Sequence, residues 1–185
     1  MSSGSIDMYI GPMFAGKSTM LIRTANKYKS IGMKIMVINN KKDNRYGNNK
    51  IITHDQISIK SIMVDELNEI LSNYEYFCEF KNSDIIIIEE LQFFNDIKFI
   101  IEASDFHNKK VIVSGLDGDF QRKPFESVIN LIPYADNITK LKGFCKICRD
   151  GTPSIFSKRI VNDNSTLLIG GSETYESVCR KHYNN

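Results

Sequence analysis

One short segment constrains the fold of this chain more than any other: GPMFAGKS, at residues 11–18, follows an apolar stretch and precedes residues with helical spacing. It fits the pattern G-x-x-x-x-G-K-[ST], which between a strand and a helix predicts a phosphate-binding loop rather than an accidental glycine turn. The glycines let backbone N–H groups converge on phosphate oxygens, and the start of the helix adds positive potential. Lys17 would reach the β- and γ-phosphates, and Ser18 would offer its hydroxyl to Mg²⁺. The expected phosphate loop comprises Gly11, Pro12, Met13, Phe14, Ala15, Gly16, Lys17, Ser18 and Thr19.

Around this loop, apolar strands alternate with helical segments. We expect strands at residues 6–11, 34–39, 84–89 and 109–116, and helices at 17–32 and 64–74. A further helical pattern separates the last two strands, and the polar stretch 40–55 reads as a long mobile loop. Strands that are apolar on both faces predict an α/β fold of the P-loop NTPase (RecA-like) type, with a mostly parallel sheet covered on both sides.

The run IIIIEE places two adjacent acids, Glu89 and Glu90, at the end of an apolar strand. In an open parallel sheet, ligands bind beyond the carboxyl ends of the strands. Neighbouring residues of an extended strand point to opposite faces, so the two carboxylates should serve different partners. We expect one to hold Mg²⁺ through its waters and the other to face the group that attacks the γ-phosphate. A solvated strand end is the simpler alternative, which the nearby phosphate loop argues against.

The second chemical signature is a set of cysteines and a histidine with zinc-ligand spacing. Cys145 and Cys148 form one C-x-x-C pair, and Cys179 and His182 form a C-x-x-H pair. Two such pairs supply the four ligands of a tetrahedral Zn²⁺, and a closed set of four implies a structural rather than a catalytic metal. Four unrelated residues are the alternative. Cys78 stands alone and is expected to be an inert core thiol.

The sequence pattern changes near Gly143, after which the segments are short, rich in loop-forming residues and interrupted by cysteines. With 185 residues, the chain is long enough for one full domain and a small appendage. We therefore expect a P-loop nucleotide-binding domain at 1–142 and a zinc-binding domain at 143–185.

Aromatic residues gather near the same rim as the two glutamates. The segment 115–125 follows the fourth strand and combines glycines with basic and aromatic residues. Together with Phe93, its side chains Leu116, Phe120 and Phe125 would form a pocket for a planar base, although ordinary core packing is an equal alternative. His54 and His107 carry no partner pattern, so we expect surface or capping roles for them.

Composition excludes several classes of function. The formal net charge of +2 gives no basic footprint for duplex DNA or anionic lipid. The sequence holds no run of eighteen apolar residues, no signal-peptide pattern and no myristoylation pattern. Four cysteines without an export signal indicate a reducing compartment, so we expect a cytoplasmic protein that binds neither nucleic acid nor membrane.

These motifs, in this order, resemble the small zinc-containing (type II) thymidine kinases of animals, bacteria and large DNA viruses, the viral members most of all. The resemblance covers nearly the whole chain and rests on GPMFAGKST, DNRYG, THD, EELQFF, LDGDFQRKPF, NLIP, GG and SVCRKHY. It implies transfer of the γ-phosphoryl group of ATP to the 5′-hydroxyl of thymidine, with Mg²⁺, to give thymidine monophosphate for nucleotide salvage and DNA synthesis. It also implies structural Zn²⁺, a homotetramer, and thymidine triphosphate as a feedback inhibitor.

The resemblance also assigns roles to residues. Glu90 matches the catalytic base and Glu89 the Mg²⁺-associated acid, which Asp43 would support. Arg45 matches a basic residue near the phosphates. Other residues match the walls and the cover of the thymine site. The cover is the loop between the zinc pairs, which is called a lasso in this family. The matching residues are Met13, Phe93, Leu116, Phe120, Phe125, Ser157 and Tyr175.

Three positions depart from the family pattern. Glu89 stands where Asp is usual, and its extra methylene should shift the carboxylate. Leu91 replaces the usual Gly, which speaks against a special backbone conformation there. His182 stands where Cys is common, and because His binds metal only when neutral, metal binding should weaken at acid pH.

Two other readings remain open at this point. One is a P-loop ATPase whose zinc knuckle binds nucleic acid, which the balanced charge argues against. The other is a nucleotide-binding regulatory module without turnover, which would leave Glu90 without a task.

Overall fold

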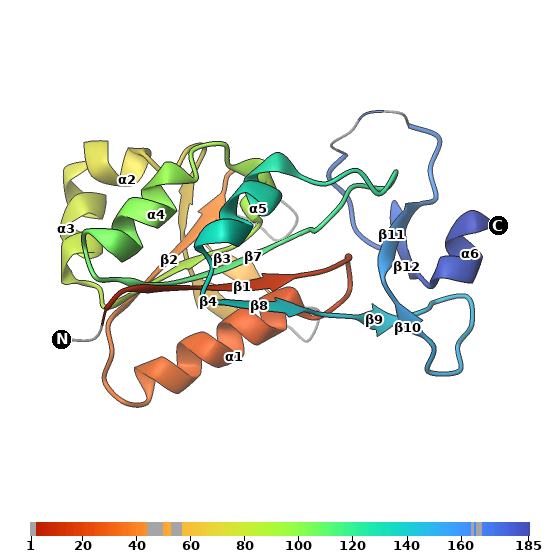
Figure 1. The fold of residues 1–185 in the computed structure, drawn as a ribbon, viewed down its shortest axis with the longest axis horizontal. Helices are drawn as coiled ribbons and strands as arrows, with labels where there is room; N and C mark the ends of the chain where they lie inside the picture. Colours follow the sequence, from red (N-terminus) through yellow and green to blue (C-terminus); the bar gives the residue numbers. More distant parts are fainter. Residues whose placement is uncertain (1–2, 44–49, 53–56, 164, 166–167) are drawn as a thin grey trace.

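The computed structural model describes residues 3–43, 50–52, 57–163, 165 and 168–185 (Figure 1). The predicted residues Arg45 and His54 lie outside these described residues. Among the residues described, none of the helices combines the length and apolar character needed to cross a membrane.

A six-stranded sheet forms the centre of the molecule, in the order β5-β2-β6-β7-β1-β8. Every pairing between its neighbours is parallel, so the carboxyl ends of the strands meet at one edge. β7 therefore lies between the strand that precedes the phosphate loop and the strand that precedes the two glutamates. The strands of this sheet are β1 (Ser5–Ile10), β2 (Ile35–Asn40), β5 (Ile62–Val64), β6 (Ile85–Ile88), β7 (Lys110–Gly115) and β8 (Asn137–Lys140).

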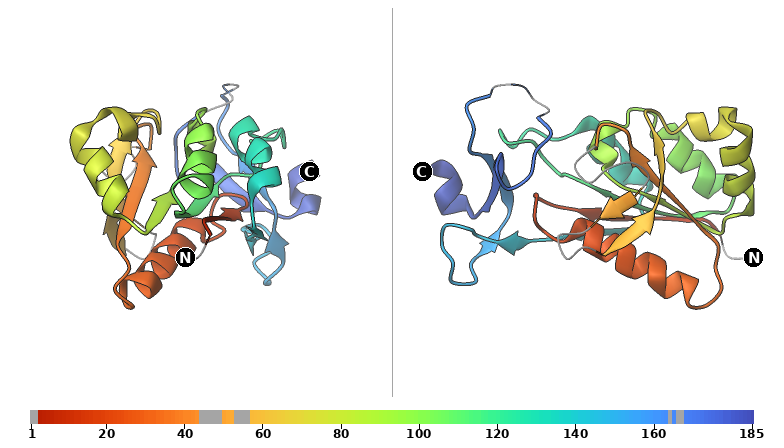
Figure 2. Two further views of the ribbon diagram at one scale, coloured as in Figure 1. Left: turned by 60° about the vertical axis from the view of Figure 1, so that its left-hand side comes forward. Right: turned by 180° about the vertical axis from the view of Figure 1, so that it is seen from behind.

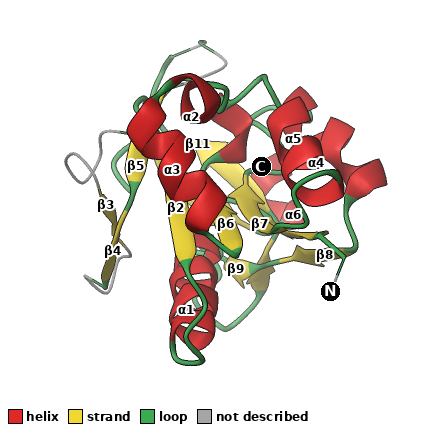
Figure 3. Ribbon diagram, turned by 90° about the vertical axis from the view of Figure 1, so that its left-hand side faces the viewer, coloured by secondary structure: helices red, strands yellow, loops and turns green. Residues whose placement is uncertain are grey.

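Helices cover both faces of the sheet (Figures 1 and 2). They can pack there because successive strand residues point to opposite faces and are apolar on both. On one face, α1 (Lys17–Lys29) packs Leu21, Ile22 and Ala25 against every second residue of the strands. The hairpin of β3 (Lys50–Ile52) and β4 (Ser58–Lys60) lies on the same side (Figure 3). The opposite face carries a larger cluster under the helices α2 (Glu69–Ser72), α3 (Tyr74–Asn82), α4 (Lys98–Asp105) and α5 (Glu126–Leu131).

The C-terminal segment lies at the carboxyl edge of the sheet (Figure 1). It is built from two short antiparallel pairs and a final helix, and a small cluster around Val178 forms its interior. Its elements are β9 (Gly143–Phe144), β10 (Pro153–Ser154), β11 (Phe156–Arg159), β12 (Tyr175–Val178) and α6 (Arg180–Asn184).

The predicted α/β class with a mostly parallel sheet is confirmed, but several local expectations are wrong. The stretch 40–55 is not all loop, because residues 50–52 pair with β4. The predicted helix 64–74 begins inside β5 and is split between α2 and α3, because the Asn73 side chain accepts a hydrogen bond from the Tyr76 N–H and starts a new helix. Cys78 is half-buried on α3 rather than in the core.

Candidate functional site

The phosphate loop that follows β1 contains two positions that only glycine can occupy without backbone strain. Gly11 has φ +147°, and a Cβ there would lie 2.4 Å from the Leu141 carbonyl oxygen. Gly16 has φ +79° and caps α1, where its carbonyl accepts the Met20 N–H at 2.9 Å. Both glycines therefore meet a backbone requirement, as the motif predicted.

Within the loop, Lys17 and Met13 already have defined partners. Lys17 Nζ donates to the Pro12 carbonyl at 2.8 Å, so its ammonium is folded over the loop. The Met13 N–H donates to Ser157 Oγ at 2.9 Å, across 144 residues of sequence. The loop is thus fastened to β11 of the C-terminal segment, and the buried Ser157 contacts the loop backbone.

Glu89 follows β6 directly and shares a hydrogen bond with the phosphate loop. The Ser18 hydroxyl donates to its carboxylate, and Glu89 is only 3% exposed. On the neighbouring strand, the Ser114 hydroxyl is buried and has no hydrogen-bond partner among the residues that the structure describes. The register Ile88–Val113 places Ser114 beside Glu89 on the α1 face of the sheet. The Glu89 carboxylate and the Ser18 hydroxyl, which meet at the phosphate loop, are oxygen ligands of the kind that suit Mg²⁺.

Glu90 has a different environment, for a reason that the sequence did not indicate. β6 ends at Ile88, and Glu90 adopts a left-handed conformation with φ 54° instead of continuing the strand. The unusual backbone therefore falls on Glu90 and not on Leu91, whose side chain is fully buried in the following turn η1 (Leu91–Phe93). The Gln92 Nε2 amide donates to the Glu90 carboxylate. The two acids do have separate partners, as predicted, but strand alternation is not the cause.

Aromatic side chains line the same edge of the sheet. Phe93, Leu116 and Phe120 are half-buried at the carboxyl edge, whereas Phe125 packs against the large hydrophobic cluster. The Arg159 guanidinium lies 3.8 Å from the Phe120 ring centroid, and its Nη2 donates to the Tyr175 hydroxyl at 2.8 Å. Arg159 is thus a bridge between the two aromatic residues predicted for the base site.

Asp43 lies just beyond the end of β2 and is buried. The Asn39 side-chain amide donates to its carboxylate at 3.2 Å, and the Asp43 N–H donates to the Asn40 carbonyl at 2.9 Å. These contacts hold Asp43 in a tight turn at the carboxyl edge of the sheet.

Three residues of the site were missed in the sequence: Gln92, Arg159 and Tyr183. Gln92 stands two positions after Glu90, which is the only local signal for it. Arg159, with a side chain 2% exposed, looks like any surface cation in the sequence. Tyr183, whose hydroxyl donates to the Phe120 carbonyl at 2.7 Å, directly follows His182 and carries no sequence pattern of its own.

The predicted zinc ligands converge in the C-terminal segment. The three sulfur atoms and one imidazole nitrogen of Cys145, Cys148, Cys179 and His182 all lie within 4.8 Å of one another. His182 Nδ1 is 3.3–3.5 Å from the three sulfurs, and the sulfurs of Cys148 and Cys179 are 3.8 Å apart. A tetrahedral Zn²⁺ with ordinary bond lengths needs about 3.6 Å between N and S and about 3.8 Å between two S atoms. The geometry therefore fits zinc.

The thiols of this cluster differ in acidity. Burial alone would raise the pKa of Cys145, but backbone N–H groups of Cys148 and Cys179 and the His182 ring outweigh it and lower that pKa to about 6. Burial and the neighbouring Cys145 raise the pKa of Cys148 to about 11. The backbone around Cys145 thus favours a thiolate, the form that binds a metal.

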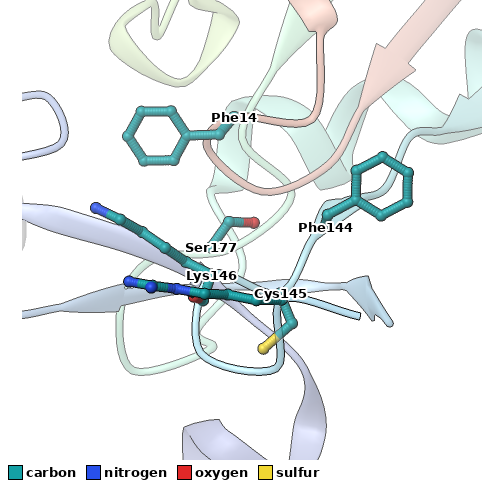
Figure 4. Close-up of a pocket in the computed structure, with 6 residues that line it drawn as sticks. Phe14, Phe144, Cys145, Lys146 and Ser177 are labelled. Carbon is teal, nitrogen blue, oxygen red and sulfur yellow. The ribbon is translucent and has the colours of Figure 1, made fainter. Parts of the chain in front are cut away.

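A cavity of about 510 Å³ separates the phosphate loop from the cysteine cluster (Figure 4). Figure 4 shows Phe14 on the phosphate loop and Phe144 on the segment that leads to Cys145. The cavity is lined by Phe14, Phe144, Cys145, Lys146, Arg149 and Ser177. It shows that the C-terminal segment faces the phosphate loop directly.

Several known proteins are similar to this chain. The family model described as thymidine kinase matches residues 4–183. The thymidine kinase of Myxoma virus (strain Uriarra) is 44% identical over 99% of this chain and 98% of its own length. That of Vaccinia virus (strain Western Reserve) is 40% identical over 99% and 98%, and thymidine kinase a of Arabidopsis thaliana is 38% identical over 98% and 75%. Among solved structures, domain III of the Thermotoga maritima replication initiation protein DnaA aligns with 74% of this chain and 54% of its own, at 13% identity and a TM-score of 0.44.

Proposed function

The chain belongs to the thymidine kinase family, and from that premise we propose how its residues transfer the γ-phosphoryl group of ATP to the 5′-hydroxyl of thymidine. The reaction is that of an ATP-dependent kinase, with ATP and thymidine as substrates. The assignment of roles rests on the different partners of the two acids. The Glu89 carboxylate accepts a hydrogen bond from Ser18 of the phosphate loop, whereas the Glu90 carboxylate accepts one from Gln92, which is not part of that loop.

Glu90 acts as the general base in this proposal. Glu90 follows the carboxyl end of β6, is buried, and accepts a hydrogen bond from the Gln92 amide. It accepts the proton of the 5′-hydroxyl late, because the phosphoryl transition state is loose, and its larger contribution is to orient that hydroxyl toward the γ-phosphate.

The phosphate loop binds the donor. Its backbone N–H groups and Lys17 would hold the β- and γ-phosphates, and Lys17 would exchange the Pro12 carbonyl for phosphate oxygens. Ser18, Glu89 and Asp43 would hold Mg²⁺, directly or through water. When bound, Mg²⁺ would neutralise charge on the phosphates. Arg45 is proposed to assist near the phosphates.

Thymidine is proposed to bind between the phosphate loop and the C-terminal segment. Met13, Phe93, Leu116, Phe120 and Phe125 would form its walls. Tyr175 and Ser157 belong to β12 and β11, whose connecting segment would cover the base and exclude water from the transfer. The contact of the Arg159 guanidinium with the Phe120 ring and the hydrogen bond from Met13 to Ser157 support this arrangement, because they join the two sides of the proposed site.

We also propose that Cys145, Cys148, Cys179 and His182 hold structural zinc, and that residues 143–185 form a separate domain anchored by it. Zinc would fix the two strands from which the covering segment departs. A homotetramer, feedback inhibition by thymidine triphosphate and a cytoplasmic location are further proposals, which follow from the family alone.

The experiment that tests this function offers the protein labelled ATP, Mg²⁺ and each deoxynucleoside in turn. We expect labelled thymidine monophosphate as the product. ATP turnover that is equally fast without any nucleoside would overturn the kinase assignment. Retention of a single-stranded or duplex oligonucleotide on a filter at low salt would instead favour an ATPase that acts on nucleic acid.

A further inference from the structure

We propose that Gln92 is a positioning residue that sets the orientation of the Glu90 carboxylate and couples it to the wall of the thymine site. This inference rests on the proposed function of Glu90. Gln92 itself would contact neither ATP nor thymidine, and would act through its two hydrogen-bond partners.

The first step of the argument is the pair of contacts made by the Gln92 amide. Its Nε2 donates to Oε2 of Glu90, and its Oε1 accepts the Leu116 N–H at 2.9 Å. A carboxylate needs a donor and a backbone N–H needs an acceptor, so only one orientation of the amide satisfies both. Gln92 is 6% exposed, so neither contact is readily replaced by water.

The second step concerns the backbone that brings Gln92 to this place. The left-handed conformation of Glu90 turns the chain into η1, and the Glu90 carbonyl accepts the Phe93 N–H at 2.9 Å. This tight turn brings the Gln92 side chain back to the Glu90 carboxylate, although Gln92 lies two positions later in the sequence. Leu91, fully buried, anchors the turn, and its carbonyl accepts the Ser127 hydroxyl at 3.0 Å.

The third step is the space that the neighbouring strand leaves for the amide. A Cβ on Gly115 would lie 3.1 Å from Gln92 Oε1 and 3.1 Å from Leu91 Cβ. Any larger residue at the end of β7 would therefore press on Gln92. The absence of a side chain at Gly115 lets the amide reach the Leu116 N–H behind it.

The consequence for catalysis is a fixed carboxylate. A hydrogen bond from a buried amide restricts rotation of the Glu90 carboxylate and favours one approach to the 5′-hydroxyl. The same amide holds the backbone of Leu116, which lines the proposed base site. The position of the base wall and the position of the catalytic carboxylate are thus set by one side chain.

The test replaces Gln92 with Met, which has similar length but neither donates nor accepts at these positions, and with Glu. For Gln92→Met we expect kcat to fall roughly ten- to a hundredfold, the usual effect of losing a hydrogen bond to a charged group, while the KM for ATP stays within about twofold. Lys27→Met, at an exposed position in the last turn of α1, introduces the same side chain away from the site and should keep wild-type kcat.

Gln92→Glu separates positioning from packing through its pH profile. Its carboxyl donates to Glu90 only while protonated, so the kcat ratio of Gln92→Glu to Gln92→Met should rise as the pH is lowered. A ratio that is constant with pH, or a Gln92→Met variant within twofold of wild-type kcat, would overturn the proposal. If Gln92→Met fails to fold, the pH profile of Gln92→Glu against wild type decides by the same criterion.

Failure of this inference can be told from failure of the proposed function. Wild-type kcat in Gln92→Met together with a large loss in Glu90→Gln would reject only the role of Gln92. Full activity in Glu90→Gln, or no thymidine phosphorylation by the wild type, would reject the proposed function itself.

Discussion

The Tyr183 hydroxyl donates a hydrogen bond of 2.7 Å to the Phe120 carbonyl and so joins the cysteine/histidine cluster to the loop after β7. Tyr183 directly follows His182, and its N–H donates to the Cys179 carbonyl at 3.0 Å. The Arg122 guanidinium lies 4.5 Å from the Tyr183 ring centroid, which adds a second contact between the same two segments. The proposed zinc site and the proposed thymine site are therefore mechanically connected through one residue.

Removing only the hydroxyl of Tyr183 tests this connection. For Tyr183→Phe we expect the KM for thymidine to rise roughly two- to tenfold, since a single neutral hydrogen bond contributes about 0.5–1.5 kcal/mol. The KM for ATP should not change, because the phosphate loop makes no use of this bond. Steady-state kinetics with each substrate varied provides the measurement. Tyr74→Phe, on a side chain 81% exposed, is the control, and an equal KM in both variants would contradict the connection.

Glu90→Gln tests the catalytic base. The amide cannot accept a proton from the 5′-hydroxyl, so we expect kcat to fall roughly a hundredfold or more, with nucleotide binding retained. Glu102→Gln makes the same chemical change on α4, in an ion pair with Lys98, and should leave kcat unchanged. A comparable loss in both variants would point to general destabilisation.

Because Ser18 and Glu89 share a hydrogen bond, we expect substitutions of these two residues to have coupled effects on the Mg²⁺ concentration that the enzyme requires. Loss of a residue that orients a metal ligand usually weakens metal affinity roughly ten- to a hundredfold, so Glu89→Gln should raise the Mg²⁺ concentration for half-maximal activity by that factor. Ser18→Ala should act in the same direction. Because the two groups touch, the double variant should show less than the sum of both effects. Strict additivity would mean that they act independently.

Metal analysis of the purified protein should find about one zinc per chain that resists dialysis. Chelation, or His182→Ala, should increase amide hydrogen exchange across residues 143–185, because zinc binding contributes directly to folding. The six-stranded sheet has its own hydrophobic clusters on both faces, so its exchange should change little. Unchanged exchange in a metal-free protein would contradict the ligand assignment.

His107 predicts a small dependence of stability on pH. His107 is exposed overall, but its ring packs edge-on against Phe80, and this partial desolvation, followed by the charges of Lys81 and Lys109, lowers its pKa below the ordinary value. The unfolded chain therefore binds a proton more readily, and the folded state should lose stability as pH falls below about 6.5. In His107→Gln this loss should be smaller, as measured by urea unfolding at pH 7 and pH 5.5. An identical pH dependence in both proteins would contradict the prediction.

Local motifs were the most predictable part of the site. The phosphate loop depends on glycines at Gly11 and Gly16, and their positive φ angles are a property of those residues. The C-x-x-C and C-x-x-H pairs likewise bring their own ligands close within each pair. In both cases the spacing along the chain sets the local geometry, so a sequence pattern is sufficient to predict it.

The edges of the sheet could not be predicted in the same way. β8 has all four residues exposed and lacks an apolar pattern, so it reads as loop, yet it pairs with β1 along Asp7–Ile10. β5 has three residues and pairs with β2. Short edge strands are stabilised by the neighbour they join, and their own sequence carries little signal.

By itself, the sequence determined the chemical groups available: a phosphate loop, two acids at a strand end, and four ligands for a metal. Tertiary structure alone decided how those groups meet. It placed Ser157 against Met13, Arg159 between Phe120 and Tyr175, and Gln92 beside a Glu90 in a left-handed conformation. The physical reason is that these contacts join residues that are distant in the chain or depend on close packing, such as the space left by Gly115, whereas motif geometry depends on residues a few positions apart.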